Sequence, residues 1–248
     1  MLSKSNIKYI QSLQHKKFRD EYQVFMAEGP KVVNELLRSG VFECKRIFAL
    51  EEWVNSQSET ILNIAGNNLE QVEQFELEKI AFYTTPNQVV AIFSIRKPID
   101  KIEVNEGITL VLDNIKDPGN FGTIIRTADW FGIKNIVCSE DTVDMYNNKV
   151  VQSTMASLAR VNILYVNLPE WLNANNMVPV IAATLDGIHP DKVKNSSPMI
   201  LIIGNESNGI RPEILEMSDK QVTIPRIGHA ESLNAAVATG ILLHALTQ

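Results

Sequence analysis

Several chemistries are excluded by what this sequence lacks. It contains only two cysteines, Cys44 and Cys138, and they form no CxxC or Cys/His pattern. Neither a disulfide framework nor a zinc site is therefore predicted, and no metal is expected. Of the four histidines, only His229 lies near another candidate site residue, Ser232, and no nucleophile is arranged beside it.

Long apolar runs and nucleotide-binding loops are also missing. No stretch of 18 apolar residues occurs, and the basic N-terminal segment has no apolar region followed by a cleavage site. We therefore expect a cytoplasmic protein that neither spans a membrane nor is secreted. The sequence has no G-x-G-x-x-G loop after a strand and no G-x-x-x-x-G-K-[ST] loop. Standard dinucleotide binding and nucleoside triphosphate hydrolysis are not predicted.

Charge is unevenly distributed along the chain. The net charge of −6 argues against a general attraction to polyanions. Residues 1–46, however, carry nine Lys and Arg against five Asp and Glu. This basic segment, 4–46, is interpreted either as a phosphate-contacting patch or as a solvated helix face.

The first part of the chain is typical of a small α/β module. The 248 residues, 45% of them hydrophobic, suffice for one large or two modest domains. A short strand precedes Gly29-Pro30, and a helix to Ser39 places four apolar residues on one face before Gly40. We expect strands at 46–50 and 89–95, with a helix at 53–65 and an acidic helix or loop through Glu78 between them. The charged stretch after Lys97-Pro98 indicates a linker, so we predict domains over 1–100 and 107–248.

The second part alternates strands and helices, which predicts an α/β fold with a parallel sheet. Its apolar runs do not alternate with polar residues, as is typical of strands covered on both faces. Strands are expected at 110–112, 135–138, 161–165, 179–183, 199–203 and 222–224, and helices at 121–131, 148–158, 169–175 and 232–246.

Three polar segments each follow an apolar strand of this second part. They are DPGNFGTIIRTA from Asp117, GNESNG from Gly204 and IPRIGHAESLN from Ile224. In an open parallel sheet, ligands bind beyond the carboxyl ends of the strands, so a composite site is predicted there. Each residue alone also has an ordinary structural explanation. Asn120 and Ser232 suit helix N-caps, Arg126 a surface arginine, and Glu206 a solvated loop residue.

Taken together, these three segments resemble the three motifs of the SpoU (TrmH-type) RNA ribose methyltransferases of the SPOUT superfamily. The resemblance is strong over 108–248, and residues 18–97 are similar, more weakly, to the family's ribosomal-protein-like substrate-binding domain. It implies an α/β domain with a C-terminal trefoil knot, preceded by a small α/β domain. It also implies S-adenosylmethionine as cofactor, RNA as substrate and a homodimer.

The same resemblance assigns roles to residues of this chain. Its motifs place Asn120, Arg126, Glu206, Ser232 and Asn234 in the catalytic set, and Thr184, Gly204, Ile224 and Leu233 at the cofactor. Two positions depart from the family pattern, because Ala156 stands where many relatives have glycine and Arg226 where many have an apolar residue.

The implied reaction transfers a methyl group in line to a ribose 2′-hydroxyl, so positioning should dominate catalysis. A guanidinium is essentially never deprotonated in proteins, so we expect Arg126 to hold a phosphate and stabilise the developing alkoxide. Ribosomal RNA is favoured as substrate by analogy. The alternatives are a transfer RNA 2′-O-methyltransferase, a non-catalytic RNA-binding paralogue, and a knotted enzyme that methylates a base nitrogen.

Overall fold

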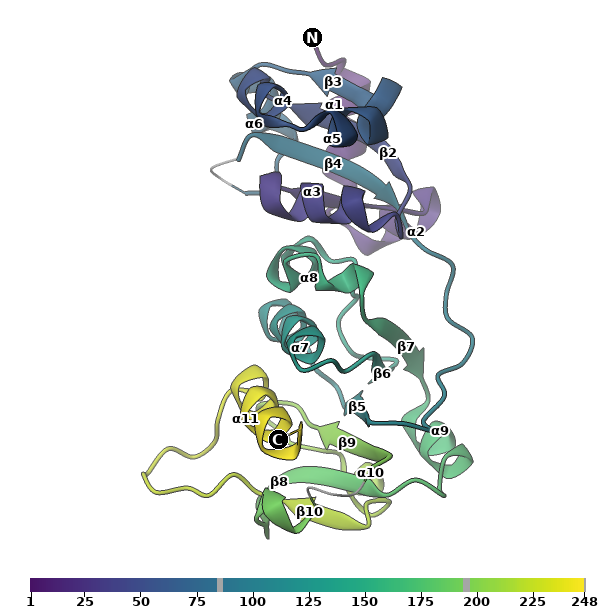
Figure 1. The fold of residues 1–248 in the computed structure, drawn as a ribbon, viewed down its shortest axis with the longest axis vertical. Coiled ribbons are helices and arrows are strands. Elements are labelled where there is room, and N and C mark those ends of the chain that lie inside the picture. Colours follow the sequence, from purple (N-terminus) through teal and green to yellow (C-terminus); the bar gives the residue numbers. More distant parts are fainter. Residues whose placement is uncertain (84–86, 194–196, 248) are drawn as a thin grey trace. The chain divides into compact units, whose positions relative to one another are not determined.

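The computed structural model describes residues 1–83, 87–193 and 197–247. The chain divides into two compact units, which are described separately (Figure 1). The first unit comprises Met1–Lys97 and Asp144–Ala159, and the second comprises Pro98–Val143 and Arg160–Gln248.

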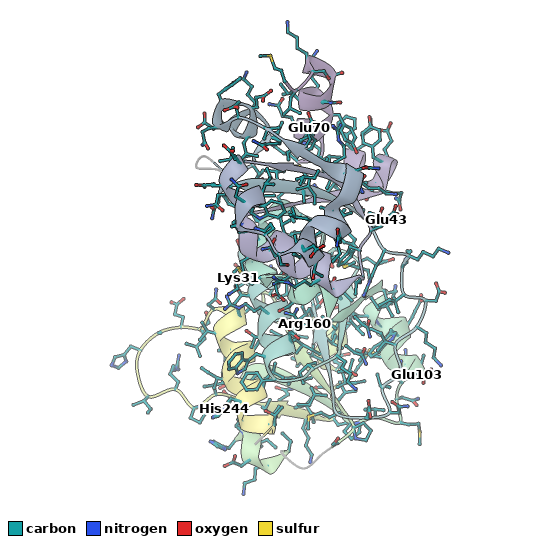
Figure 2. The ribbon with its side chains drawn as sticks, turned by 45° about the horizontal axis from the view of Figure 1, so that its top comes forward. Lys31, Glu43, Glu70, Glu103, Arg160 and His244 are labelled. Carbon is teal, nitrogen blue, oxygen red and sulfur yellow. The ribbon has the colours of Figure 1, made fainter. Side chains whose placement is uncertain are left out.

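The first unit is built on a mixed sheet with the strand order β1-β4-β2-β3. Strand β4 is antiparallel to both β1 and β2, whereas β2 and β3 are parallel. On β2 and β3, Arg46 and Glu70 form an ion pair at 2.6 Å (Glu70 is labelled in Figure 2). The elements of this unit are α1 (Lys4–Ser12), α2 (Lys16–Tyr22), β1 (Val24–Glu28), α3 (Pro30–Ser39), β2 (Cys44–Ala49), α4 (Glu51–Ser56), α5 (Glu59–Ala65), β3 (Leu69–Gln71), α6 (Gln74–Ile80), β4 (Val89–Ser94) and α8 (Asn148–Thr154).

Helix α3 is present as its sequence pattern predicts. Its four apolar residues Val32, Val33, Leu36 and Leu37 are all buried, and Gly40 ends it in the left-handed conformation. The single helix predicted over 53–65 is wrong. The chain there forms α4 and α5, because the side chain of Ser58 accepts a hydrogen bond from the backbone N–H of Ile61 and starts a new helix.

Residues 144–159 pack with the first unit. The ring of Tyr146 lies 4.9 Å from that of Phe25, and burial raises the pKa of Tyr146 to about 12. The helix predicted over 148–158 ends at Thr154, because Met155 and Ala156 both adopt positive φ. The domain limits 1–100 and 107–248 stay a prediction.

The second unit contains the predicted parallel sheet, with six strands in the order β10-β8-β9-β5-β6-β7. All five neighbouring pairs are parallel. Strand β8 is longer than predicted. The elements are β5 (Ile108–Leu112), α7 (Pro118–Trp130), β6 (Asn135–Ser139), β7 (Asn162–Val166), α9 (Leu168–Ala174), β8 (Val180–Ile188), β9 (Met199–Ile203), α10 (Pro212–Leu215), β10 (Lys220–Val222) and α11 (Ala235–Thr247).

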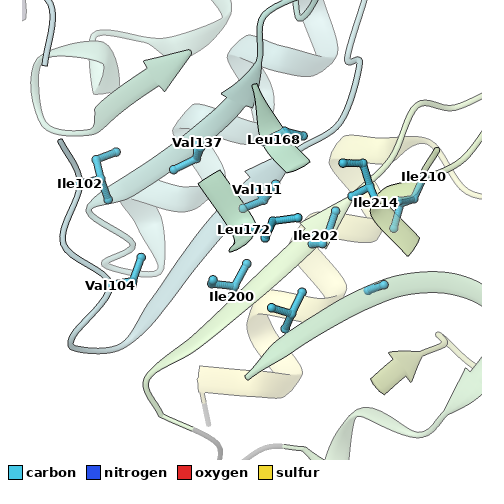
Figure 3. Close-up of a cluster of buried hydrophobic side chains, with 12 residues drawn as sticks. Ile102, Val104, Val111, Val137, Leu168, Leu172, Ile200, Ile202, Ile210 and Ile214 are labelled. Atoms are coloured by element: carbon cyan, nitrogen blue, oxygen red, sulfur yellow. The ribbon is translucent and has the colours of Figure 1, made fainter. Parts of the chain in front are cut away.

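One face of this sheet is covered by α9 and α10 (Figure 3). Side chains of the central strands, among them Val111 and Ile202, form a buried cluster with Leu172 of α9 and Ile214 of α10. Alternate residues of the same strands, such as Leu110 and Leu112, are also fully buried. Both faces of the sheet are therefore covered, which is why its strands show no alternating pattern.

Strands β5 and β9 are neighbours at the centre of the sheet. Leu112 at the end of β5 lies opposite Ile203 at the end of β9. The first two polar segments of the sequence therefore start side by side, although about 86 positions separate Asn120 from Glu206. The implied knot stays a prediction.

Candidate active site

The three polar segments of the sequence meet at the side chain of Asn120. Its amide nitrogen Nδ2 donates a hydrogen bond to Glu206 Oε1 at 2.5 Å. Its oxygen Oδ1 accepts a hydrogen bond from Asn234 Nδ2 at 2.8 Å. Because one amide bonds both neighbours, the carboxylate of Glu206 and the amide of Asn234 are held in fixed relative positions.

The expected capping roles of Asn120 and Ser232 are wrong. Asp117 caps α7, since its Oδ1 accepts a hydrogen bond from the backbone N–H of Asn120 at 2.7 Å. Helix α11 is capped by Asn234, whose Oδ1 accepts from the N–H groups of Ala236 and Val237. The amide of Asn120 is thereby left to link the two other segments, and Ser232 is exposed in the loop before α11.

Helices α7 and α11 run side by side in the same direction. Asn120 bonds Asn234 near their starts, and the rings of Phe131 and His244 lie 6.3 Å apart near their ends. The N-terminal ends of both helices therefore lie close to the carboxylate of Glu206. Helix N-termini carry partial positive charge, which favours an anion at this position.

The segment from Gly204 to Gly209 forms a closed loop. The backbone groups of Asn205 and Gly209 exchange two hydrogen bonds, at 3.0 and 2.9 Å. A Cβ atom at Gly204 would lie 2.3 Å from the carbonyl carbon of Gly209, so only glycine fits at position 204. Asn205 Oδ1 accepts from the N–H groups of Ser207 and Asn208, which fixes the turn that carries Glu206.

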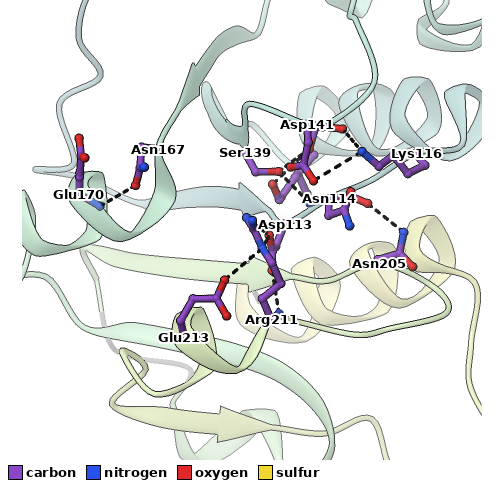
Figure 4. Close-up of polar contacts among 12 residues, drawn as sticks. Asp113, Asn114, Lys116, Ser139, Asp141, Asn167, Glu170, Asn205, Arg211 and Glu213 are labelled. Carbon is purple, nitrogen blue, oxygen red and sulfur yellow. Dashed lines mark hydrogen bonds and ion pairs between the residues drawn. The ribbon is translucent and has the colours of Figure 1, made fainter.

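An ion pair between the buried Asp113 and the partly exposed Arg211 anchors this loop to β5 (Figure 4). Asp113 is fully buried, and its carboxylate accepts hydrogen bonds from Arg211 Nε and from the backbone N–H of Arg211, each at 2.8 Å. The hydrogen bond to Asp113 raises the pKa of Arg211. A second link runs from Asn205 Nδ2 to the backbone oxygen of Asn114. This anchor was not predicted from the sequence. An acidic residue directly after an apolar strand is its only local signal.

A cleft of about 1030 Å³ lies between this loop, the end of β8 and the segment that precedes α11. All four residues predicted at the cofactor line it, namely Thr184, Gly204, Ile224 and Leu233. Glu206 and Ser232 of the predicted catalytic set line it as well. Asn120 and Asn234 are not among the lining residues, but Asn120 is hydrogen-bonded to Glu206 and to Asn234. The wall combines apolar side chains with backbone and hydroxyl groups, as small-molecule sites do.

Arg126 is the member of the predicted set that stands apart. It is exposed on α7 and is not among the described residues that line the cleft. Arg226, one of the two departures from the family pattern, does line the cleft, and its Nη1 donates to the backbone oxygen of Ala230 at 3.4 Å.

The described residues form neither a metal-binding cluster nor a membrane-spanning helix. Across 1–83, 87–193 and 197–247, no group of three or more His, Cys, Asp and Glu side chains is placed to hold a metal ion. None of the helices in the same ranges has the length and apolar character needed to cross a membrane.

Comparison with known proteins gives consistent matches for both units. Residues 107–244 match the SpoU rRNA Methylase family, and residues 4–91 match the MRM3-like substrate binding domain. The chain is 30% identical over 243 residues to the 23S rRNA (guanosine(2553)-2′-O)-methyltransferase RlmP of Bacillus subtilis, covering 97% of this chain and 95% of that protein.

Solved structures are similar over nearly the whole chain. The AdoMet-bound rRNA methyltransferase from Sinorhizobium meliloti superimposes with a TM-score of 0.87 at 33% identity, covering 99% of this chain and 96% of that one. The SpoU methyltransferase AviRb from Streptomyces viridochromogenes, at 22% identity and a TM-score of 0.82, shares the fold and covers 99% of this chain and 97% of that one.

Proposed function

This chain belongs to the SpoU rRNA methylase family, and we propose that it transfers a methyl group from S-adenosylmethionine to a ribose 2′-hydroxyl of RNA. The observation that carries the proposal is the hydrogen-bonded series Glu206, Asn120 and Asn234 beside the cleft. It brings a carboxylate and two amides to one position, where they would orient a hydroxyl and its surroundings.

The cleft fits S-adenosylmethionine in size and in chemistry. Its volume of about 1030 Å³ is in the upper range of small-molecule sites. Thr184, Ile224 and Leu233 would contact the cofactor from β8 and from the segment before α11, and the closed turn at Gly204 brings backbone close to it. When bound, the cofactor supplies an electrophilic methyl group on a sulfonium.

The residues of this chain position the nucleophile and stabilise its charge. Ser232 and Asn234 orient the ribose hydroxyl, and Glu206 fixes the amide of Asn120 and the loop. Arg126 binds the target phosphate and stabilises the alkoxide that develops on the ribose oxygen, and the hydroxyl proton passes to solvent water late in the reaction. Arg126 is suited to this part because it is exposed and permanently charged.

A homodimer is part of the proposal. Apolar side chains remain exposed along α7 and α11, where Trp130 is 85% exposed, Val237 51% and Ile241 41%. The two helices lie side by side, so both present exposed apolar side chains on neighbouring elements. Such a surface marks an interface, and a second copy of the chain would cover it. Sedimentation that gives a monomer mass at micromolar concentration would count against it.

Ribosomal RNA is the proposed substrate class, and the cytoplasm is the proposed location. The relative RlmP acts by its name on 23S rRNA and matches over the full chain. Transfer RNA is the alternative, since a relative from Aquifex aeolicus, 32% identical over 136 residues, is named as a tRNA methyltransferase. The reduced state of Cys44 and Cys138 suits a reducing compartment.

The experiment that tests the substrate is a map of 2′-O-methyl sites in total RNA from cells with and without this protein. We expect one ribosomal site to lose its methyl group in the deletion strain and to regain it with the plasmid-borne protein. Loss from a transfer RNA instead would establish the alternative. An unchanged map, together with calorimetry that shows no S-adenosylmethionine binding, would identify a non-catalytic RNA-binding paralogue.

A further inference from the structure

Four aromatic side chains gather on α1, on α2 and in the turn between them. The ring centroids of Tyr9 and Tyr22 lie 5.0 Å apart, edge to face. The rings of Phe18 and Tyr22 are almost parallel, at 14° and 6.3 Å, and His15 follows at 6.4 Å from Phe18. Tyr22 is 44% exposed and His15 is exposed, whereas Tyr9 and Phe18 are half-buried, so the cluster faces solvent at Tyr22 and His15.

The cluster adjoins the core of the first unit. Helix α1 buries Ile10, and Leu13 just after it is also fully buried, and Tyr9 packs against the same core. The ring of Tyr9 contacts that of Tyr22 across the two helices, and the ring of Phe18 stacks on Tyr22 within α2. The cluster therefore extends from the edge of the core at Tyr9 to the exposed side chain of Tyr22.

Arg19 holds the two helices at a fixed angle beneath the cluster. It is only 2% exposed, and its Nη1 donates to the backbone oxygens of Leu13 and Gln14, each at 2.9 Å. Its Nη2 forms an ion pair with Asp144 at 2.6 Å. Because the turn between α1 and α2 is fixed, the rings are held in place before any ligand arrives, which lowers the entropic cost of binding.

Basic side chains lie on the helices that carry the rings. Lys17 Nζ lies 5.8 Å from the centroid of the Phe18 ring. Lys4 and Lys8 are exposed on α1. Lys16 is paired with Asp20 at 2.6 Å, and the other acidic residue of α2, Glu21, is exposed.

We propose that Tyr9, Phe18 and Tyr22 form a stacking platform for unpaired bases of the RNA substrate, with Lys8 and Lys17 at the neighbouring phosphates. Unpaired bases stack on aromatic side chains while a basic surface follows the backbone, whereas bases inside a duplex are not available for stacking. The substrate is therefore expected to present a single-stranded loop or end to the first unit. This inference rests on the proposed function, in which RNA is the substrate, and it specifies that the RNA is single-stranded where it contacts the first unit.

The test measures binding of the full-length protein to a fluorescent single-stranded 12-nucleotide RNA and to the same sequence as a duplex. Tyr22→Ala should weaken binding of the single strand about tenfold, which is the usual effect of removing one stacked base contact. Tyr22→Phe keeps the ring and should bind like the wild type. The matched control is Phe75→Ala, since Phe75 is 47% exposed with Lys79 at 4.9 Å and has no aromatic partner among the described residues. Its affinity should not change.

The salt dependence of RNA binding distinguishes base stacking from contacts between lysine side chains and phosphates. For single strands, the slope of log K against log salt falls by about 0.7 for each phosphate contact that is lost. Lys17→Gln should reduce the slope by about this amount, whereas Tyr22→Ala should weaken binding and leave the slope unchanged. Equal single-strand affinity for Tyr22→Ala and wild type, or a preference for the duplex, would overturn the platform.

Methylation assays distinguish failure of this inference from failure of the proposed function. With the methylated RNA as substrate, Tyr22→Ala should raise KM for RNA about tenfold at unchanged kcat and unchanged affinity for S-adenosylmethionine. If the wild type methylates RNA and Tyr22→Ala has the same KM, only the platform is wrong. If the wild type methylates no RNA, the proposed function is wrong, and binding of the oligonucleotide alone decides on the platform.

Discussion

Asn120 donates a hydrogen bond to Glu206 at 2.5 Å across 86 positions of sequence. The same amide accepts a hydrogen bond from Asn234, so this one side chain connects all three polar segments. The contact depends on the sheet, because β5 and β9 are neighbours and end at the same level.

Replacing this amide with a carboxylate tests the connection. In Asn120→Asp, two carboxylates would face each other at hydrogen-bond distance, and their repulsion should lower kcat about a hundredfold at pH 8. Because like charge raises the pKa of the pair, kcat should partly recover as the pH falls towards 5, when one carboxyl takes up a proton. The control is Asn68→Asp, since Asn68 bonds a backbone oxygen in the first unit. A pH profile identical to that of the wild type would refute the arrangement.

Arg126 is predicted to contribute to the rate of methyl transfer and not to the binding of S-adenosylmethionine. Arg126→Ala should lower kcat about 10²- to 10³-fold, as loss of one charge-stabilising donor does. The affinity for S-adenosylmethionine, measured by calorimetry, should change less than threefold, because Arg126 does not line the cleft. Lys134→Ala, which removes an exposed cation of the second unit outside the basic segment 4–46, is the control and should keep full activity. Full turnover by Arg126→Ala would remove this residue from the mechanism.

The pair of Asp113 and Arg211 is predicted to position the loop that carries Glu206. Arg211→Leu leaves a fully buried carboxylate without its cation, which should lower the free energy of unfolding by about 2–3 kcal/mol. The affinity for S-adenosylmethionine should fall as well, because the loop forms one wall of the cleft. Chemical denaturation and calorimetry measure the two effects.

A double variant separates the buried charge from the loss of packing. Combining Arg211→Leu with Asp113→Asn removes both charges and should recover part of the stability. If the double variant is as unstable as the sum of the single ones, the ion pair is not the cause.

Alanine at position 156 is predicted to lower the free energy of unfolding. It adopts φ of +71° while 1% exposed, at the position where the family pattern suggested glycine. A left-handed conformation is unfavourable for alanine and not for glycine. Ala156→Gly should therefore raise the free energy of unfolding by about 0.5–1 kcal/mol.

The matched control for this substitution is Ala159→Gly, nearby in the same segment, where φ is not positive. It should lower stability by about 0.5–1 kcal/mol, since glycine loses more conformational freedom on folding. Thermal unfolding of the two variants in parallel measures the difference. Destabilisation by both would show that conformation at residue 156 does not limit stability.

Local patterns in the sequence were sufficient for the class of fold and for the strands of the second unit, whereas α1, α2, β3 and α10 were not predicted. The apolar runs predicted the strands of the parallel sheet, and the spacing of Val32, Val33, Leu36 and Leu37 predicted α3. Element ends were less predictable, because several side chains can cap a helix. Asp117 and Asn234 cap the helices for which Asn120 and Ser232 were expected to do so.

Contacts between residues that are far apart in the sequence could not be predicted from local patterns. The pair of Asp113 and Arg211 spans 98 positions, and the pair of Arg19 and Asp144 spans 125. Which charges meet is decided by strand order and by the packing of residues 144–159 on the first unit, and neither follows from local periodicity. The candidate catalytic residues were found because a family resemblance grouped them, whereas the residues that position them were not.

The most direct test of the central claim is a methyl-transfer assay with purified protein, labelled S-adenosylmethionine and unmethylated ribosomal RNA, followed by digestion to nucleosides and mass spectrometry. We predict that the label appears in a single 2′-O-methylated nucleoside, on the ribose. Label on the base, or no label in RNA while S-adenosylmethionine binds, would contradict the account.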